Sequence, residues 1–204
     1  MRKAGLFALM MTLLLTACGG GGEKDSAGQL QQQYAAVAAA EMEADITCHY
    51  GGEVREYTLK CSYTPESSAV TVKAPKNLAG ISAVVEGGQL QLDYEDISLD
   101  AGSASDAALS PVTVLPELME AAARGYVTEV SEEEREGQRC LRMSCDRTSD
   151  LSAVYTTWFH EETMLPLYSE VCLEGEVVYQ VVWNSFAVTE RTAPEQQEDR
   201  PANG

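Results

Sequence analysis

Strict alternation of apolar and polar side chains over residues 40–50 constrains this chain more than any other feature. The stretch reads AEMEADITCHY, and Gly51 and Gly52 follow it directly. Alternation with a period of two is typical of a strand that buries one face. Two consecutive glycines supply the positive φ angles of a tight hairpin turn. The sequence therefore predicts an antiparallel hairpin whose second strand begins right after the turn.

The register of this hairpin follows from the length of the turn. A loop made of residues 51 and 52 pairs Ile46 with Tyr57 and Ala44 with Leu59. Apolar residues then meet apolar residues on one face along the whole hairpin, as a one-sided sheet requires. The agreement between pattern and register makes this the strongest structural prediction in the chain.

The same alternation recurs through the rest of the chain. Further strands are expected around 70–74, 81–85, 90–94, 126–133, 141–145, 151–160, 165–173 and 177–188, and residues 101–108 are expected to form a loop. One helix is expected over 29–39, and a second after Ser110 and Pro111, ending at Gly125. Consecutive hairpins favour an α+β fold: a large curved antiparallel sheet of about ten or eleven strands, with about two helices on its concave face.

The two ends of the chain differ from the middle. A basic start at Arg2 and Lys3 precedes an apolar run over residues 5–15. This run is shorter than the roughly 20 residues that span a bilayer, but it suits a signal peptide. The last segment, 191–204, is polar and rich in proline and glutamate, so we expect a disordered tail.

Leu15-Thr16-Ala17-Cys18 resembles the lipobox of bacterial lipoproteins. The resemblance implies cleavage after Ala17 and a diacylglyceryl group on the thiol of Cys18, with a non-lipidated secretory signal as the alternative. We therefore expect a signal peptide over 1–17, a lipidated cysteine and flexible tether over 18–28, and a folded domain over 29–190. The expected location is the extracytoplasmic face of the cell membrane, because two acyl chains anchor a protein stably.

The charge and the cysteines exclude some partners and leave other questions open. A net charge of −18 disfavours nucleic acid and anionic lipid surfaces. Solubility is the simple explanation of this charge, and recognition of a basic partner is the other. The remaining cysteines are odd in number, and their pairing stays open: Cys48, Cys61, Cys140, Cys145 and Cys172. The predicted register separates Cys48 from Cys61 by about 20 Å, which excludes a disulfide between these two.

Catalytic and metal-binding motifs are weak. His160 begins a stretch HEETM that resembles the start of a zinc-protease helix, but a methionine replaces the second histidine. His49 falls on the polar face of its strand, where solvent contact is expected. We expect no enzyme activity, no metal and no cofactor.

Three segments carry a family resemblance. Residues 74–81 (APKNLAGI), 158–167 (WFHEETMLPL) and 184–186 (NSF), in their order along the chain, resemble the LolA/LolB-like superfamily of lipoprotein carriers and its anchored LppX/LprG-like relatives. The resemblance implies an unclosed barrel of about eleven strands whose apolar cavity binds acyl chains or lipidated partners. In that family an arginine holds the lid shut, and the sequence does not place this residue.

Carried onto this chain, the resemblance implies a cavity wall and a lid formed by helix residues. The expected ligand-binding residues are Met42, Ala44, Ile46, Tyr57, Leu59, Val72, Leu90 and Leu92 in the wall, and Leu115, Leu118 and Met119 in the lid. Two alternatives remain: these residues form an ordinary core, and the protein is an envelope interaction or sensor protein without a ligand. We expect a monomer.

Overall fold

The computed structural model describes residues 22–104, 110–147 and 153–190. The expected signal peptide (1–17), Cys18 and the C-terminal tail (191–204) lie outside the described residues. Within the described ranges the chain forms two helices and eleven strands. In chain order they are α1 Gly22–Ala35, β1 Val37–Tyr50, β2 Glu53–Tyr63, β3 Ser67–Ala74, β4 Ser82–Glu86, β5 Gln89–Tyr94, β6 Ile97–Ser103, α2 Val114–Arg124, β7 Tyr126–Arg135, β8 Gln138–Asp146, β9 Ala153–His160, β10 Pro166–Leu173 and β11 Glu176–Glu190.

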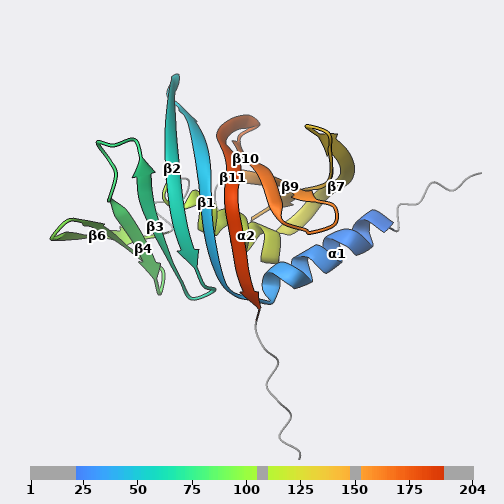
Figure 1. Cartoon of the computed structure of the whole chain (residues 1–204), viewed down its shortest axis with the longest axis horizontal. Helices are drawn as coiled ribbons and strands as arrows, with labels where there is room; N and C mark the ends of the chain where they lie inside the picture. The colour runs from blue at the N-terminus through green and yellow to red at the C-terminus, as the bar shows by residue number, and fades with distance from the viewer. Residues whose placement is uncertain (1–21, 105–109, 148–152, 191–204) are drawn as a thin grey trace, which may run out of the picture.

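All the strands belong to one curved sheet (Figure 1). Their order is β6-β5-β4-β3-β2-β1-β11-β10-β9-β8-β7, and every neighbouring pair is antiparallel. Strands that are adjacent in sequence pair with one another, except β6 and β7, which form the two edges; at the centre β1 pairs with β11. The chain thus forms β1–β6 in one half of the sheet, continues through α2, and forms β7–β11 in the other half, so that its last strand pairs with its first. The α+β fold with an unclosed sheet is confirmed.

The first hairpin has the predicted register. Ile46 pairs with Tyr57, Ala44 with Leu59, and Cys48 with Arg55. Gly51 and Gly52 both have positive φ, at 60° and 81°. The turn glycines and the alternating pattern agree on this register, and a slip by one residue would turn the apolar face to solvent.

Helix α1 differs from its prediction at both ends. It begins at Gly22, inside the segment expected to be a tether, and it ends at Ala35, before Val37. Ala27, Leu30 and Tyr34 bury one face of this helix, and packing of that face stabilises helical structure across the polar start. The prediction of a helix through residue 39 was wrong because Val37 begins β1, where it pairs with Glu190 of β11.

Strand β6 extends into the start of the loop expected over residues 101–108, as far as Ser103. Its small and polar residues pair with β5, in part through Leu99 opposite Leu92 and Ile97 opposite Tyr94. Almost every residue of β6 is exposed. Backbone pairing with an existing strand therefore decides the structure here, and the sequence pattern alone does not show it. Residues 105–109 of the expected loop lie outside the described ranges.

Helix α2 begins later than predicted. Ser110 caps a turn, in which its carbonyl accepts hydrogen bonds from the amide and hydroxyl of Thr113, and the helix starts at Val114. Pro116 lies in the first turn of the helix. It is tolerated there because the first amide groups of a helix have no acceptor within the helix.

The helices pack on the inner face of the sheet. Helix α1 contacts α2 and β7, while α2 contacts β2, β8 and β9. One continuous apolar core lies between the helices and the sheet, built from alternate residues of the strands and one face of each helix. This core contains the region where the sequence predicts a ligand.

Candidate functional site

Most of the predicted wall and lid residues come together in one buried cluster. Those in the cluster are at most 5% exposed: Met42, Ala44, Ile46, Leu59, Val72, Leu115, Leu118 and Met119. Tyr57 is partly buried at the edge of the cluster. Leu90 is buried and Leu92 partly buried, but both lie on β5, outside this cluster.

The described side chains pack closely between the helices and the sheet. Among them lie two hollows of about 10 Å³ each. A volume of this size holds about one water molecule. Neither hollow has room for an acyl chain as it stands.

The two small hollows follow the seam between α1 and the sheet. Tyr34 and Phe186 line both of them. The Tyr34 ring lies 5.3 Å from that of Phe159 and 6.0 Å from that of Phe186, measured between centroids. Its hydroxyl donates a 3.0 Å hydrogen bond to the carbonyl of Met164, and burial raises its pKa. Tyr34 is thus an aromatic contact between α1 and the strands of the second half.

Hydroxyl groups lie beneath this seam. Thr157 and Ser169 share a 2.8 Å hydrogen bond, and the indole nitrogen of Trp183 donates to the Ser169 hydroxyl at 3.0 Å. Ser169 is fully buried, so these bonds satisfy polar groups that water cannot reach. The sequence analysis missed this network, because only the pairing of β9, β10 and β11 brings the three residues together.

Two carboxylates tie α2 to both halves of the sheet. Glu117 accepts hydrogen bonds from Arg147, which follows β8, and from the hydroxyl of Tyr155 in β9 at 3.1 Å. On the other side, Glu120 accepts from the hydroxyl of Tyr63 in β2. Burial raises the pKa of both tyrosines, and the neighbouring carboxylates add to the effect. These polar contacts flank the apolar stripe of the helix.

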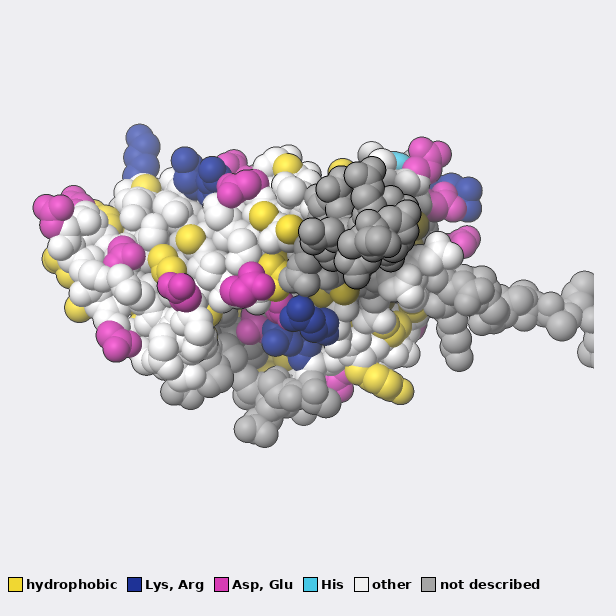
Figure 2. Space-filling view, turned by 90° about the horizontal axis from the view of Figure 1, so that it is seen from below, with side chains coloured by type: hydrophobic (Ala, Val, Ile, Leu, Met, Phe, Trp, Pro, Cys, Tyr) yellow, Lys and Arg dark blue, Asp and Glu magenta, His cyan; other side chains and the backbone are white. Residues whose placement is uncertain are grey.

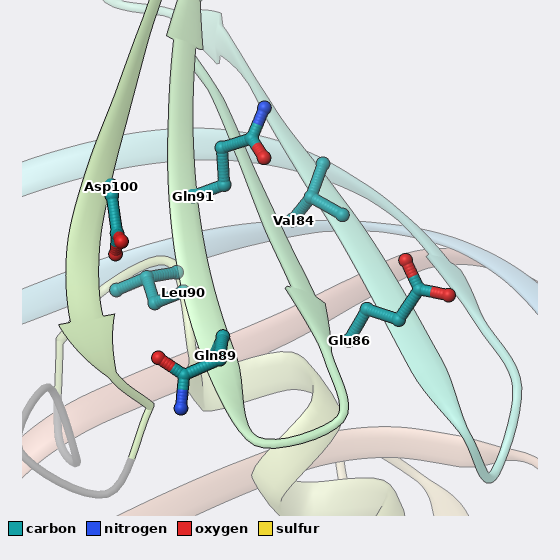
Figure 3. A pocket seen from close by; sticks show the side chains of 6 residues that line it. All are labelled: Val84, Glu86, Gln89, Leu90, Gln91 and Asp100. Atoms are coloured by element: carbon teal, nitrogen blue, oxygen red, sulfur yellow. The ribbon is translucent and has the colours of Figure 1, made fainter.

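A hollow of about 390 Å³ lies away from the helices (Figure 3). Its lining is mostly polar: Val84, Glu86, Gln89, Leu90, Gln91 and Asp100. Val84 points away from the core, because its neighbour Ala83 is buried on the inner face. The hollow is therefore a polar depression on the outer face of β4–β6.

An apolar row continues past the helices on the inner side of β5 and β6. Leu92 faces Leu99, and Tyr94 faces Ile97. Tyr94 is 43% exposed, Ile97 59% and Leu99 60%. Exposed apolar residues that adjoin one another mark interaction sites more often than scattered ones do.

The outer face of the second half carries a compact aromatic and charged group. The guanidinium of Arg135 lies 3.7 Å from the ring centroid of Tyr168 and 5.2 Å from that of Trp158. The indole nitrogen of Trp158 donates to Glu133 at 2.8 Å. Each of these groups has its partner within the group, so the arrangement stabilises the surface of the sheet.

Comparison with known proteins decides the fold class. No protein-family model matches the sequence, and no curated protein matches it. The structure aligns with that of a DUF1329 family protein from Desulfovibrio piger, at 13% sequence identity and a TM-score of 0.50, over 80% of this chain and 90% of that chain. It also aligns with a putative outer membrane lipoprotein-sorting protein domain from Vibrio parahaemolyticus, at 8% identity and a TM-score of 0.50, over 83% of this chain and 93% of that chain. The chain shares the fold of these two proteins.

The unclosed sheet of eleven strands confirms what the sequence resemblance implied about architecture. At these identities the likeness concerns the fold alone, so the chemistry has to come from the residues. The described cysteines are all free thiols, and four of the five are buried. His160 lies at the end of β9, and its Nδ1 accepts from the amides of Glu162 and Thr163 at 3.3 and 3.4 Å. The stretch that begins at His160 is thus a strand end and a turn, as the sequence analysis expected.

Two further observations concern metals and membranes. No group of three or more His, Cys, Asp or Glu side chains suited to a metal occurs in the residues that the structure describes. Over the same ranges, neither helix is long and apolar enough to cross a bilayer.

Acidic side chains are spread over the face shown in Figure 2, whereas Lys and Arg occupy a few places.

Proposed function

We propose that this protein is a lipoprotein anchored through Cys18 on the extracytoplasmic face of the membrane. In this proposal, it binds an acyl chain, another apolar ligand or a lipidated partner between α2 and the sheet. The single observation that carries the proposal is the position of α2, which covers an apolar interior and is held at both flanks by hydrogen-bonded carboxylates. The proposal assigns no catalytic group and no cofactor.

The composition of the interior supports uptake of a flexible ligand. Met42, Met119 and Met143 are all at most 2% exposed in the core. Methionine side chains repack easily, because they are unbranched and polarizable. An acyl chain that replaced the apolar stripe of α2 would recover about 0.8 kcal/mol for each buried methylene, which offsets the cost of moving the helix.

The contacts of α2 suit a helix that opens. Tyr155 and Arg147 hold Glu117, and Tyr63 holds Glu120, through groups that water can replace when the helix moves. The resemblance implied an arginine that holds the lid, and Arg147 is the residue of this chain that we propose for the role. At the other end, α2 continues through Gly125 into β7, which gives the helix a fixed end.

The short distance between the proposed lipid and the domain supports a ligand taken from the membrane. Helix α1 begins at Gly22, four residues after Cys18. Four extended residues reach about 14 Å. The folded domain would therefore stay close to the bilayer, and the name of the lipoprotein-sorting neighbour agrees with a lipid-related role.

Ligand binding is tested with lipid extraction and a fluorescent fatty acid. We expect mass spectrometry of the gently purified protein to find bound lipid, and 11-dansylaminoundecanoic acid to bind saturably. Glu117→Gln and Glu120→Gln loosen α2 and should raise the association rate several-fold. Glu132→Gln is the matched control, because this carboxylate pairs with Arg139 on the sheet, 3.8 Å away, and not with α2. Protein without lipid, and without saturable binding in any variant, would contradict the proposal.

The anchor is tested separately. Cys18→Ser should leave the chain as a precursor that is not cleaved after residue 17 and that lacks the mass of the lipid. Intact-mass measurement of the membrane fraction checks both expectations. A mature wild-type protein that begins at another residue and carries no lipid would contradict the anchoring, whatever the outcome of the fatty-acid experiment.

A second candidate function is that of an envelope interaction protein that keeps its interior filled. The exposed row of Tyr94, Ile97 and Leu99 favours this alternative, together with the close packing beneath α2. The fatty-acid experiment separates the two candidates, because an interaction protein of this kind would remain free of lipid.

A further inference from the structure

Strand β6 is one of the two outer strands of the sheet. It pairs with β5 on one side, and the described residues place no strand on its other side. Native edge strands are usually protected by lysine, proline or a covering element. The sequence of β6, ISLDAGS, contains neither lysine nor proline. The described residues place no partner strand beside the outer backbone groups of residues 97–101, whereas the amide of Gly102 donates to the Asp100 carboxylate at 2.9 Å.

The side chains of β6 alternate in character across the sheet. Ile97 and Leu99 lie on the inner side, where they extend the apolar row of Leu92 and Tyr94. Ser98 and Asp100 lie on the outer side, opposite Asp93 and Gln91. A strand added to β6 would meet an apolar surface with one set of its residues and an acidic surface with the other.

The acidic surface lacks basic residues to neutralise it. Between Lys76 and Arg124 the chain contains Asp and Glu but no Lys or Arg. The carboxylate of Asp93 instead accepts from Ser98 at 2.6 Å and from Gln91 at 3.0 Å. Both hydrogen bonds lower the pKa of Asp93, and the one from Ser98 has the larger effect, so the carboxylate stays negatively charged.

Elsewhere in the described residues several acidic side chains form ion pairs. In the second half of the sheet Glu129 pairs with Arg142 at 2.8 Å, and Glu161 pairs with Arg139 at 2.9 Å. In the described part of β4–β6 no Asp or Glu has a Lys or Arg within ion-pair distance. The contrast points to a basic partner for the β6 end, where Figure 2 shows acidic and hydrophobic side chains near one another.

The position of β6 disfavours the bilayer as its occupant. Strand β6 and helix α1 lie at opposite ends of the long axis of the molecule (Figure 1). With the lipid on Cys18, α1 is the element nearest the membrane; this step rests on the proposed anchoring. Strand β6 then points away from the bilayer, toward proteins of the envelope or its surroundings.

We propose that β6 binds an extended segment of a partner protein, in which apolar and basic residues alternate, as an additional strand of the sheet. Backbone hydrogen bonds at the open edge provide affinity, and the two faces of the added strand provide selectivity. Ile97 and Leu99 contact the apolar residues of the segment. Asp93 and Asp100 contact its basic residues. This surface is separate from the interior beneath α2, so it acts with or without a ligand there.

Synthetic peptides test the proposal on the full mature protein. The probes are fluorescein-labelled eight-residue peptides: one alternates Lys and Val, one alternates Glu and Val, and one has four Lys followed by four Val. We expect fluorescence anisotropy to show binding of the alternating Lys-Val peptide only, weakened by salt because the contact is partly electrostatic.

Paired variants place the contact on β6. Leu99→Ser should weaken binding of the Lys-Val peptide at least ten-fold, and Asp100→Asn should weaken it and reduce its salt dependence. The matched controls are Val54→Ser and Glu56→Gln on β2. Val54 is 61% exposed, as Leu99 is 60% exposed, but it lies on the outer face beside His49. Glu56 is an exposed carboxylate far from β6 in the strand order.

Several outcomes would overturn the proposal. If the Glu-Val peptide bound as tightly as the Lys-Val peptide, the surface would have no preference for basic residues. If Val54→Ser and Leu99→Ser weakened binding equally, the contact would not lie on β6. Phosphatidylcholine vesicles form a further arm, and vesicle binding that depends on Leu99 would assign the surface to a membrane instead. Leu99→Ser leaves the interior intact, so this variant should still bind the fatty acid. Peptide binding and fatty-acid binding can therefore fail independently, which keeps failure of the β6 proposal distinct from failure of the proposed function.

Discussion

The hydroxyl of Tyr63, the last residue of β2, donates a hydrogen bond to the carboxylate of Glu120 on helix α2. Arg124, one turn along the helix, binds the same carboxylate at 2.8 Å. With Tyr155 on the opposite flank, Tyr63 connects α2 to strands that lie far apart in the sheet. The helix therefore holds the two halves of the sheet in one arrangement, which is the physical basis for treating it as the element that opens.

Tyr63→Phe tests the strength of this connection. The substitution removes one hydrogen bond to a charged acceptor, which contributes about 1 to 3 kcal/mol. We expect the free energy of unfolding to fall by about that amount in urea titrations. Tyr94→Phe, at a tyrosine that is 43% exposed, serves as control and should change it by less than about 0.5 kcal/mol. Equal effects of the two substitutions would show that the Glu120 contact adds nothing.

Leu59→Ala tests the core beneath α2. Leu59 is fully buried between Ala44 of β1 and Val72 of β3. Truncation removes transfer free energy and leaves a cavity, at a cost of about 2 to 5 kcal/mol. Chemical denaturation measures this cost. Val54→Ala on the outer face should change the stability by less than about 0.5 kcal/mol, and a small effect of Leu59→Ala would indicate a loosely packed interior.

Gly125→Ala tests the close approach between the end of α2 and β8. A Cβ atom at Gly125 would lie 2.5 Å from the carbonyl oxygen of Ala121 and 2.7 Å from Cβ of Cys145. The φ angle of −63° suits any residue, so the cost is steric and amounts to about 1 to 3 kcal/mol. Gly28→Ala is the control, because nothing lies within 4 Å of its Cβ position in α1. There the exchange should stabilise the helix by about 0.5 to 1 kcal/mol; thermal unfolding of both variants checks the opposite signs.

The buried thiols predict a loss of stability in alkali. Burial raises the pKa of Cys61 from 9.0 to about 12 and that of Cys145 to about 11. Above pH 9 the unfolded chain loses these protons while the folded protein keeps them. The protonated thiols therefore make their full contribution to the free energy of unfolding below pH 9, and this contribution is lost as the pH rises toward 12. Between neutral pH and about pH 10.5 we expect a fall of about 2 kcal/mol from Cys61, by the 1.36 kcal/mol that accompanies each pKa unit.

Cys61→Ala identifies this contribution. The variant should lose less stability than the wild type between the two pH values, although its stability at neutral pH is lower. Urea titrations at each pH measure the difference within each protein, so the effect of truncation cancels. Parallel pH dependence in both proteins would contradict the assignment to Cys61.

Local patterns explain which elements were predictable. The first hairpin was predicted in its register because alternation and the Gly51-Gly52 turn act over neighbouring residues. The apolar stripe of α2 was predicted for the same reason, since Leu115, Leu118 and Met119 recur at helical spacing and are buried. Strand β6 was missed because its residues carry little apolar alternation, and only the neighbouring strand β5 gives them a partner.

The burial of most candidate residues was predictable, but how closely they pack was not. Most of the expected wall and lid residues do meet, although Leu90 and Leu92 lie outside the cluster, since a one-sided sheet and an amphipathic helix bury the faces that their sequences mark as apolar. How closely they pack depends on the distance between α2 and the sheet. The partners of Glu117 and Glu120 depend on the same distance, and no local pattern encodes it.

By itself, the sequence determined the alternating strands, their hairpin turns and the helix that crosses between the two halves, because backbone preference and burial of one face are local properties. Only the tertiary structure decided that β1 pairs with β11, that the described side chains pack closely beneath α2, and that β6 lies at one edge of the sheet. These features depend on contacts between residues far apart in the chain, such as Ile46 with Val181, whose free energies come from mutual burial and have no counterpart in either segment alone.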